Sequence, residues 1–208
     1  TYNSLGLFNS TAFNSSSVTI SAGCGTITTD TTLTSDLGTD GSCIHIGAHN
    51  IILNCDNYEI NYSNAGTLGY GINNSGYDNV TIKNCNVKEG TSTTNAKNAI
   101  YVDNDVRNLT IHNNTLTVTG VQSNGIYLEG LGTTLGNISE NTISASGVNG
   151  VGIFASNSAN NLTIKSNNLV LSNSAGIYLF SANDSLVSGN NFVVNGNSVT
   201  NILVQDSH

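Results

Sequence analysis

Cys43, His45 and His49 are the first residues whose types and spacing could support chemistry. Thiolate and imidazole groups are ligands that zinc and copper prefer in proteins. Alternation along a strand would place Cys43 and His45 on one face, and His49 could approach from the turn that follows. Cys43 has a competing use, however, because it can form a disulfide with Cys24. We therefore predict no metal site and no cofactor.

A second candidate is the acidic pair Asp103 and Asp105, which Arg107 closely follows. Glycoside hydrolases use two carboxyl groups that flank the scissile bond, and acidic calcium ligands with a basic side chain would suit a polysaccharide lyase. In the repeats described below, Glu129 and Asn157 match the position of this pair only loosely. A solvated turn explains the acids better, so we predict no catalytic residues and no enzymatic activity.

The elements that would have to position these residues are repeats of about 25 residues. Each complete repeat contains three apolar phrases, and a fixed period of this length is typical of solenoid proteins. The repeats lengthen at Ser63–Tyr70 and Lys88–Lys97, which we interpret as loops that bulge from the coil. The first phrase opens at Ile44, Ile72, Ile100, Ile126, Ile153, Ile177 and Ile202. The second phrase places Leu53, Ile82, Ile111, Ile138, Ile164 and Val187 in another column.

The phrases alternate with period two, as in Leu162-Thr163-Ile164, which is typical of short strands. Three such strands cannot enclose a core alone, but stacked coils about 4.8 Å apart bury a continuous apolar column. We predict an all-β parallel β-helix of about seven coils with three short strands per coil. An antiparallel sandwich is disfavoured, because hairpins would not keep equivalent residues one whole period apart. We expect an N-terminal arm at 1–17 and a single β-helix domain at 18–208, with an irregular first coil at 18–43.

The sequence contains 35 asparagines, and this excess needs a structural cause. Asparagine tolerates the left-handed backbone conformation of tight turns, and stacked amides can hydrogen-bond from coil to coil. We therefore interpret the recurring asparagines as scaffold residues in left-handed turns. Equivalent turn positions are occupied by Cys85, Asn114, Asn141, Asn167 and Asn190.

Composition excludes two classes of partner and indicates a compartment. Five basic residues and a net charge of −8 cannot neutralise a phosphate backbone, so we expect no nucleic acid. No apolar run approaches the roughly 20 residues that span a bilayer, so we expect no membrane insertion. The chain starts with Thr1 instead of methionine, so we expect a processed or excised N-terminus.

Four cysteines fit two disulfides and an oxidising compartment. Cys24 and Cys43 bracket the first coil. Cys55 and Cys85 fall near the same turn position in adjacent coils, whose separation of about 4.8 Å suits a disulfide. Both pairings predict an extracellular or cell-surface protein.

An aromatic residue follows the inward isoleucine in four successive coils. If isoleucine faces inward, these rings stack on the outer surface, where an apolar patch usually marks an interaction site. The surface could face sugars or another subunit, or a segment of this chain could cover it. The column consists of Tyr101, Tyr127, Phe154 and Tyr178.

Asn-x-Ser/Thr acceptor motifs for N-glycosylation occur ten times. With 49 serines and threonines in 208 residues, chance alone would give about eight such motifs for 35 asparagines. We expect several to carry glycans, foremost the first four, and an intact mass of 21.6 kDa would exclude this. The acceptor asparagines are Asn9, Asn14, Asn61, Asn73, Asn79, Asn108, Asn113, Asn137, Asn161 and Asn183.

The phrases GIYLEG, GIFASNSANNLTIKSNNLV and GIYLFSANDSLVSGNNFVV resemble the repeats of right-handed parallel β-helix proteins of the PbH1 type. The segment CGTITTDTTLTSDLGTDGSCIHIGAHNIILNC is similar to the first coil of archaeal and bacterial extracellular β-helix proteins. The resemblance implies a right-handed helix in a secreted or surface protein. Some proteins with this fold degrade polysaccharides and some are linked to copper delivery, so the resemblance alone does not imply a function.

Both ends of the chain suggest self-association. The last phrase stops partway through a coil without an amphipathic cap, which exposes strand edges. We predict a non-enzymatic extracellular structural protein whose copies join head to tail into a filament or surface layer, with the arm bridging the joint. A fragment of a longer solenoid would also lack a cap. The alternative function is a carbohydrate-binding module or a polysaccharide-degrading enzyme. The predicted assembly residues are Tyr2, Leu5, Leu7, Phe8, Phe13, Ile202 and Val204.

Overall fold

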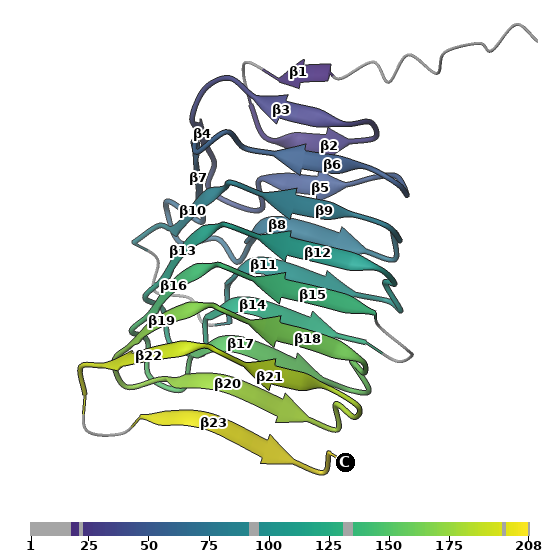
Figure 1. Cartoon of the computed structure of the whole chain (residues 1–208). Coiled ribbons are helices and arrows are strands. Elements are labelled where there is room, and N and C mark those ends of the chain that lie inside the picture. Colours follow the sequence, from purple (N-terminus) through teal and green to yellow (C-terminus); the bar gives the residue numbers. More distant parts are fainter. Residues whose placement is uncertain (1–17, 21–22, 92–95, 131–134, 197–198, 208) are drawn as a thin grey trace, which may run out of the picture.

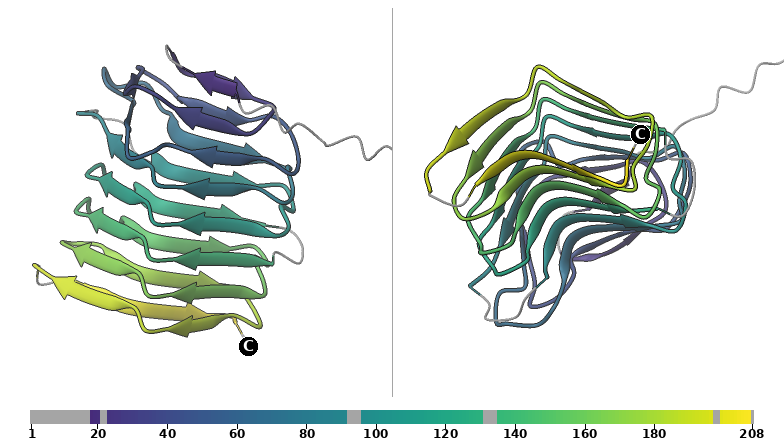
Figure 2. Two further views of the ribbon diagram at one scale, coloured as in Figure 1. Left: turned by 45° about the horizontal axis from the view of Figure 1, so that its top comes forward. Right: turned by 90° about the horizontal axis from the view of Figure 1, so that it is seen from below.

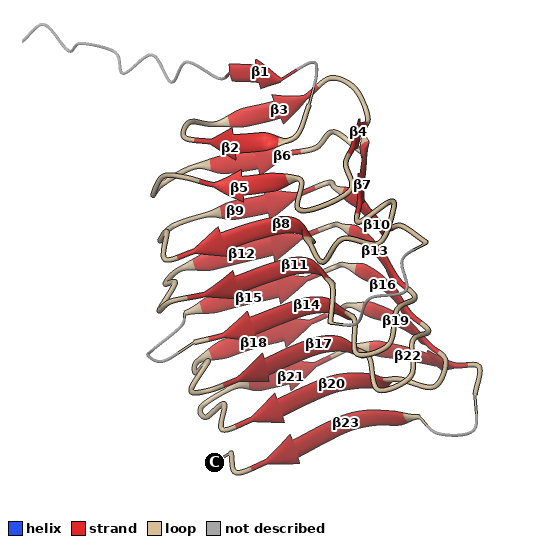
Figure 3. Cartoon of the chain, turned by 180° about the vertical axis from the view of Figure 1, so that it is seen from behind, coloured by secondary structure: helices blue, strands red, loops and turns tan. Residues whose placement is uncertain are grey.

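The computed structural model describes residues 18–20, 23–91, 96–130, 135–196 and 199–207. These residues form strands and turns, which stack along one axis as three parallel sheets (Figures 1 and 3). The predicted arm at 1–17, with Tyr2, Leu5, Leu7, Phe8, Phe13, Asn9 and Asn14, lies outside the described residues.

Each complete coil contributes one strand to each of the three sheets. Sheet A contains β1 (Val18–Ile20), β3 (Thr31–Leu33), β6 (Ile52–Asn54), β9 (Thr81–Lys83), β12 (Leu109–His112), β15 (Gly136–Ser139), β18 (Leu162–Lys165) and β21 (Leu186–Ser188). Sheet B contains β2 (Gly25–Ile27), β5 (Ile44–Ile46), β8 (Tyr70–Ser75), β11 (Asn98–Asp103), β14 (Asn124–Glu129), β17 (Val151–Ser156), β20 (Ala175–Phe180) and β23 (Thr200–Gln205). Sheet C contains β4 (Leu37–Gly38), β7 (Glu59–Tyr62), β10 (Asn86–Glu89), β13 (Thr115–Val118), β16 (Thr142–Ala145), β19 (Asn168–Leu171) and β22 (Asn191–Val194).

The chain visits sheets B, A and C in turn, and Figure 2 shows the resulting three-sided outline along the axis. Within the described residues, sheets of eight, eight and seven strands correspond to the predicted coil number of about seven. All the strand pairs are parallel, which confirms the predicted solenoid and excludes the sandwich. The first coil is the irregular one, with strands of only two or three residues.

Both predicted apolar columns lie in the core, except at their C-terminal ends, where Val187 is half-buried and Ile202 is exposed. Ile100 pairs with Ile72 and Ile126, and Ile111 pairs with Ile82 and Ile138. These six side chains are fully buried. Equal coil spacing therefore places like residues above one another, and each column removes a continuous apolar surface from water.

An internal asparagine ladder forms the turn from sheet A to sheet C. Asn141 Nδ2 donates to Asn167 Oδ1 at 3.0 Å and to the carbonyl of Ile111 at 2.9 Å. Its Oδ1 accepts the main-chain N–H of Asn114 at 3.0 Å and the Nδ2 of Asn114 at 2.9 Å. The scaffold role predicted for the ladder asparagines is confirmed.

The predicted backbone conformation of the ladder residues is wrong. The positive φ angle belongs to the residue before each of them: Asn84, Asn113, Glu140, Ser166 and Gly189 have φ angles of 53° to 61°. The left-handed residue reverses the chain, and the following asparagine points inward. The left-handed backbone conformation and the inward-pointing amide therefore belong to two neighbouring residues and not to one.

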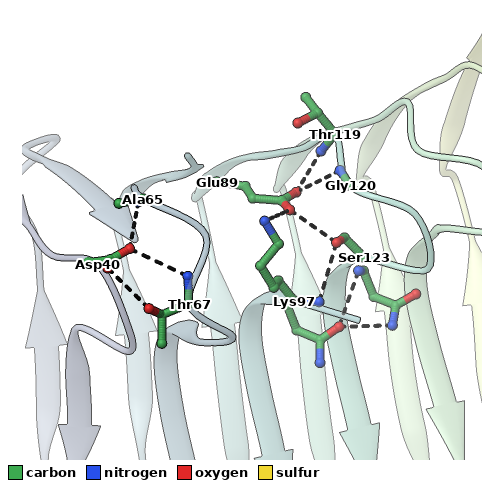
Figure 4. Close-up of polar contacts among 10 residues, drawn as sticks. Asp40, Ala65, Thr67, Glu89, Lys97, Thr119, Gly120 and Ser123 are labelled. Atoms are coloured by element: carbon green, nitrogen blue, oxygen red, sulfur yellow. Dashed lines mark hydrogen bonds and ion pairs between the residues drawn. The ribbon is translucent and has the colours of Figure 1, made fainter. Parts of the chain in front are cut away.

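A buried ion pair lies beside the turns that lead from sheet C to sheet B (Figure 4). Lys97 Nζ lies 2.7 Å from Glu89 Oε1, and neither side chain is exposed. Glu89 Oε2 accepts the N–H groups of Thr119 and Gly120 at 2.7 and 3.0 Å, and Oε1 accepts the hydroxyl of Ser123 at 3.2 Å. This Glu89–Lys97 clamp joins the end of β10 to the turn of the following coil.

The structure corrects the bounds of the loop that was predicted at Lys88–Lys97. Lys88 and Glu89 belong to β10, and Lys97 directly precedes β11 with a fully buried side chain. The loop was predicted from the longer repeat at this point, which does not indicate which side chains are buried. Charged side chains are rarely buried alone. Here the two opposite charges are buried together as an ion pair.

Candidate functional site

The Cys43, His45 and His49 candidates do not converge on a common centre. Cys43 forms a disulfide with Cys24, with an S–S distance of 2.05 Å, as predicted. His45 is the middle residue of β5 and is only half-buried between two buried neighbours, so it faces outward. His49 Nδ1 accepts the N–H of Asp78 at 2.8 Å. Among the described residues, no three His, Cys, Asp or Glu side chains gather closely enough to hold a metal ion.

The second disulfide joins Cys55 to Cys85 across adjacent coils. Their Cα atoms are 4.6 Å apart, close to the coil spacing from which we predicted the pair. Both sulfur atoms are buried. The two disulfides therefore link the first three coils covalently.

The acidic candidates separate in the structure. Asp103, at the end of β11, accepts hydrogen bonds from the hydroxyl of Ser75 and, at 2.9 Å, from Asn104 Nδ2. Asp105 lies in the following turn with a φ angle of 59° and is exposed. Arg107 is also exposed. The sequence pair Asp103 and Asp105 therefore does not form one face of a strand.

Another carboxylate does align with Asp103. Glu129 pairs with it in the register of β11 and β14, so our interpretation of a loose match was wrong. Its spacing of 26 residues equals that of Ile100 and Ile126 and was the available signal. Glu129 accepts the hydroxyl of Tyr101 at 2.8 Å and Asn157 Nδ2 at 3.2 Å. Both carboxylates thus serve as hydrogen-bond acceptors within the protein.

The predicted rings form a continuous aromatic column on the outer face of sheet B, and Tyr70 extends it. Ring centroids of Tyr70 and Tyr101 are 4.4 Å apart, although Tyr70 lies opposite Asn98 in the strand register. Sequence spacing missed Tyr70 because its ring reaches along the surface from a different register position. The other neighbouring centroid distances are 5.5 Å for Tyr101–Tyr127, 4.8 Å for Tyr127–Phe154 and 4.8 Å for Phe154–Tyr178.

The column presents mainly ring edges to its surroundings. Phe154 lies within 6° of the plane of Tyr127 and within 9° of that of Tyr178. Each of its faces is therefore covered by a neighbouring ring, whereas the partially positive edges remain accessible. A sugar that packs flat against an aromatic ring would need one of the covered faces. The stacking thus argues against the sugar platform that we had considered.

The hydroxyls of Tyr70 and Tyr101 stay protonated well into alkaline solution. Burial raises the pKa of Tyr101 far above its usual range, and the hydrogen bond to Glu129 raises it further. Burial also raises the pKa of Tyr70, with the negative charges of Asp103 and Glu129 adding to the effect. At neutral pH these phenols act as hydrogen-bond donors.

A groove runs beside the column, between the rings and the turns that enter sheet B. One hollow of about 340 Å³ lies between Phe154 and Tyr178 on one side and Gln122 and Asn149 on the other. A second, of about 270 Å³, shares Asn149, Val151 and Tyr178 and continues to Thr200 in β23. No lining side chain of either hollow carries a formal charge at neutral pH. We call this surface the side groove.

The C-terminal end of the solenoid exposes apolar side chains. All six residues of β23 are exposed, including Ile202 at 44% and Val204 at 56%. Leu186 in β21 and Val194 in β22 are 59% and 44% exposed. In the register these residues continue the strands of the preceding coil, so the face has the pattern of a coil surface.

The eight described glycosylation candidates differ in the use of their amides. Asn79 Nδ2 donates to Asn50, Asn108 Nδ2 donates to Asn79, and Asn113 Nδ2 donates to Asn84, all between coils. Asn108, Asn137 and Asn161 line a hollow of about 220 Å³ on sheet A. Asn61 and Asn73 are half-buried on outer strand faces, and Asn183 lies in a turn.

Comparison with known proteins places these features in a wider group. A family model described as "Periplasmic copper-binding protein (NosD)" matches residues 9–203. Among solved structures, the surface adhesin PfbA of Streptococcus pneumoniae matches with 14% sequence identity and a TM-score of 0.25. The match covers 83% of this chain and 62% of the adhesin chain. No curated protein sequence matches the chain.

Proposed function

The chain belongs to the NosD family of β-helix proteins, and on this premise we propose that it is a non-enzymatic surface protein that joins copies of itself end to end. The family description places its members in the periplasm, and the four cysteines form two disulfides. Such bonds persist in oxidising compartments. The protein is therefore extracytoplasmic, and the proposal assigns it to the cell surface. Among the described residues, no helix is long and apolar enough to cross a membrane.

Copper, which the family description names, does not fit the donor groups of this chain. Copper favours Cys, His and Met ligands. The sequence contains no Met, and both described cysteine pairs are oxidised. His49 already accepts a main-chain hydrogen bond, and His112 Nδ1 lies 3.2 Å from the hydroxyl of Ser139. The proposed function therefore includes no copper step.

The observation that carries the proposal is that sheets A and B end at complementary levels (Figure 1). Counted from β2, sheets A and C end at their seventh strands, β21 and β22, whereas sheet B continues to an eighth, β23. At the other end, sheet A starts one strand earlier, with β1. In a second copy stacked in the same direction, β1 would lie beside β21, and β2 would pair with β23. The projecting β23 of one copy and the projecting β1 of the next would then lie at the same level, side by side in sheets B and A.

The exposed apolar side chains at the C-terminal end supply the driving force. Stacking would cover Ile202 and Val204, which hold the inward positions of β23, and burial of apolar surface yields about 25 cal/mol per Å². It would also pair the free main-chain edge of β23. The contact joins two different surfaces of the molecule and does not close on itself, so repetition produces a filament.

The test is assembly of the 208-residue chain by itself, because a further coil of a longer polypeptide would use the same face. Negative-stain imaging and sedimentation are expected to detect rods longer than one molecule. Val204→Asp should weaken association at least about tenfold, since it buries an unpaired charge. Val148→Asp is the matched control, because Val148 is 53% exposed on a lateral turn. A wild-type monomer at all concentrations, or normal rods from Val204→Asp, would refute the proposal.

The contacts of Asp103 and Glu129 support the non-enzymatic part of the proposal. Asp103 and Glu129 each accept two hydrogen bonds from neighbouring side chains. The alternative of a polysaccharide-degrading enzyme is favoured by their alignment beside the aromatic column. Release of reducing sugar that is lost in Asp103→Ala would establish that alternative.

We include glycosylation in the proposal, with Asn61 and Asn73 as the foremost described acceptors. Among the described residues, neither donates an Nδ2 hydrogen bond of the kind that links Asn79, Asn108 and Asn113 to adjacent coils. A glycan on Asn61 or Asn73 would therefore leave those links intact. The expected result is a native mass above 21.6 kDa that decreases in Asn61→Gln or Asn73→Gln. A native mass equal to that of the bare chain would contradict it.

A further inference from the structure

No described segment of the chain fills the side groove, and the length of the groove suits an extended peptide. Its two hollows share Asn149, Val151 and Tyr178 and follow the solenoid axis from β14 to β23. At a coil spacing of about 4.8 Å, the three steps between these strands span about 14 Å. Ring edges and Val151 offer apolar contact, while Gln122 and Asn149 offer amide donors and acceptors. An extended peptide can use both kinds of group.

Residues 1–17 have the composition that such a groove requires. They contain no charged side chain, which matches the uncharged lining. An extended segment of 17 residues reaches up to about 56 Å, which exceeds the length of the groove several times. Its large apolar side chains are Tyr2, Leu5, Leu7, Phe8 and Phe13.

The order of the sheets determines which groove the segment meets. Because the chain passes from sheet B to sheet A, the residues before β1 would otherwise continue sheet B beside β2. In the proposed stack, β23 of the preceding copy holds that place. Residues 1–17 must then leave the sheet and pass over its outer face. The side groove of the preceding copy lies on this face and ends level with β23, since Thr200 lines it.

We propose that residues 1–17 of one copy bind in the side groove of the copy that precedes it, along Phe154 and Tyr178. This inference rests on the proposed end-to-end assembly and assigns its second contact. From the sequence we expected the arm to bridge the joint by adding to a strand edge. We now place the arm beside the aromatic column instead. The aromatic column thereby gains a role as one wall of a binding site between copies.

The test protein carries Val204→Asp, which weakens end-to-end association, and lacks residues 1–17. Binding in the side groove can then be measured apart from contact at the end face. A fluorescent peptide with the sequence of residues 1–17 is expected to bind this protein saturably, one per molecule, in an anisotropy titration. Tyr178→Ala should weaken binding about tenfold, because it removes an aromatic group common to both hollows. Tyr77→Ala is the matched control, since Tyr77 is also half-buried and in ring contact, with His49. It should leave the affinity unchanged within about twofold.

The outcomes distinguish this inference from the proposed function. Absence of saturable binding, or equal affinity for Tyr178→Ala and wild type, would overturn the inference while rods of the full chain still support assembly. Val204→Asp with its own residues 1–17 should bind the peptide as well as the truncated protein does. Exclusion of the peptide would mean that the segment occupies its own groove, which overturns docking between copies. A neutral oligosaccharide that binds where the peptide does not would also overturn the inference.

Discussion

Replacing Glu89 by alanine is expected to lower the free energy of unfolding by about 3–5 kcal/mol, because it leaves the Lys97 ammonium buried without its counter-charge. Lys97 is fully buried, and Glu89 Oε1 lies 2.7 Å from its Nζ. The substitution also removes the acceptor for the N–H groups of Thr119 and Gly120. Denaturant unfolding followed by circular dichroism measures the change, with Glu59→Ala, at a half-buried surface position of β7, as a control expected within about 0.5 kcal/mol.

A double substitution tests whether charge causes this loss. In Glu89→Met/Lys97→Met the interior loses both charges and keeps similar volume, so we expect a stability within about 2 kcal/mol of wild type. The hydroxyl of Tyr62 is buried nearby without a hydrogen-bond partner among the described residues, and burial raises its pKa, as does the charge of Glu89. If the double variant is as unstable as Glu89→Ala, the effect comes from packing or from the lost acceptor of Thr119 and Gly120, and not from the unpaired charge.

Asn141→Leu is expected to destabilise the domain by about 4 kcal/mol, although it preserves most of the side-chain volume. Asn141 is 1% exposed and takes part in four hydrogen bonds, each with a net value of about 1 kcal/mol. The substitution also leaves the amide of Asn114 without its buried acceptor. The change in denaturation midpoint at constant slope measures this loss.

Asn191→Leu is the matched control for the ladder. Asn191 Nδ2 donates to Asn168 Oδ1 at 2.7 Å, but the pair lies at the exposed surface, where water replaces a lost partner. We expect a change below about 1 kcal/mol for this variant. Equal losses at positions 141 and 191 would contradict the view that burial makes the internal ladder essential.

The features of the fold that repeat were predictable from the sequence. Ile100 and Ile126 stand one period apart and pair directly, because a solenoid turns equal spacing into contact. The same rule predicted Cys55–Cys85 and the stacked rings of Tyr127 and Phe154. It would also have aligned Asp103 with Glu129 if their common spacing had been given more weight than the irregular turns around them.

Features that break the period required the tertiary structure. Tyr70 joins the aromatic column through the reach of its ring, and Glu89 and Lys97 form a buried ion pair in a segment whose longer repeat had suggested a bulging loop. The side groove depends on the height of the turns beside the rings, which no spacing encodes. The sequence by itself therefore determined the β-helix and its inward columns, because these follow from one repeated register. Only the tertiary structure decided which charges are buried, which ring faces are covered and how the two ends match, because these depend on side-chain reach and strand level.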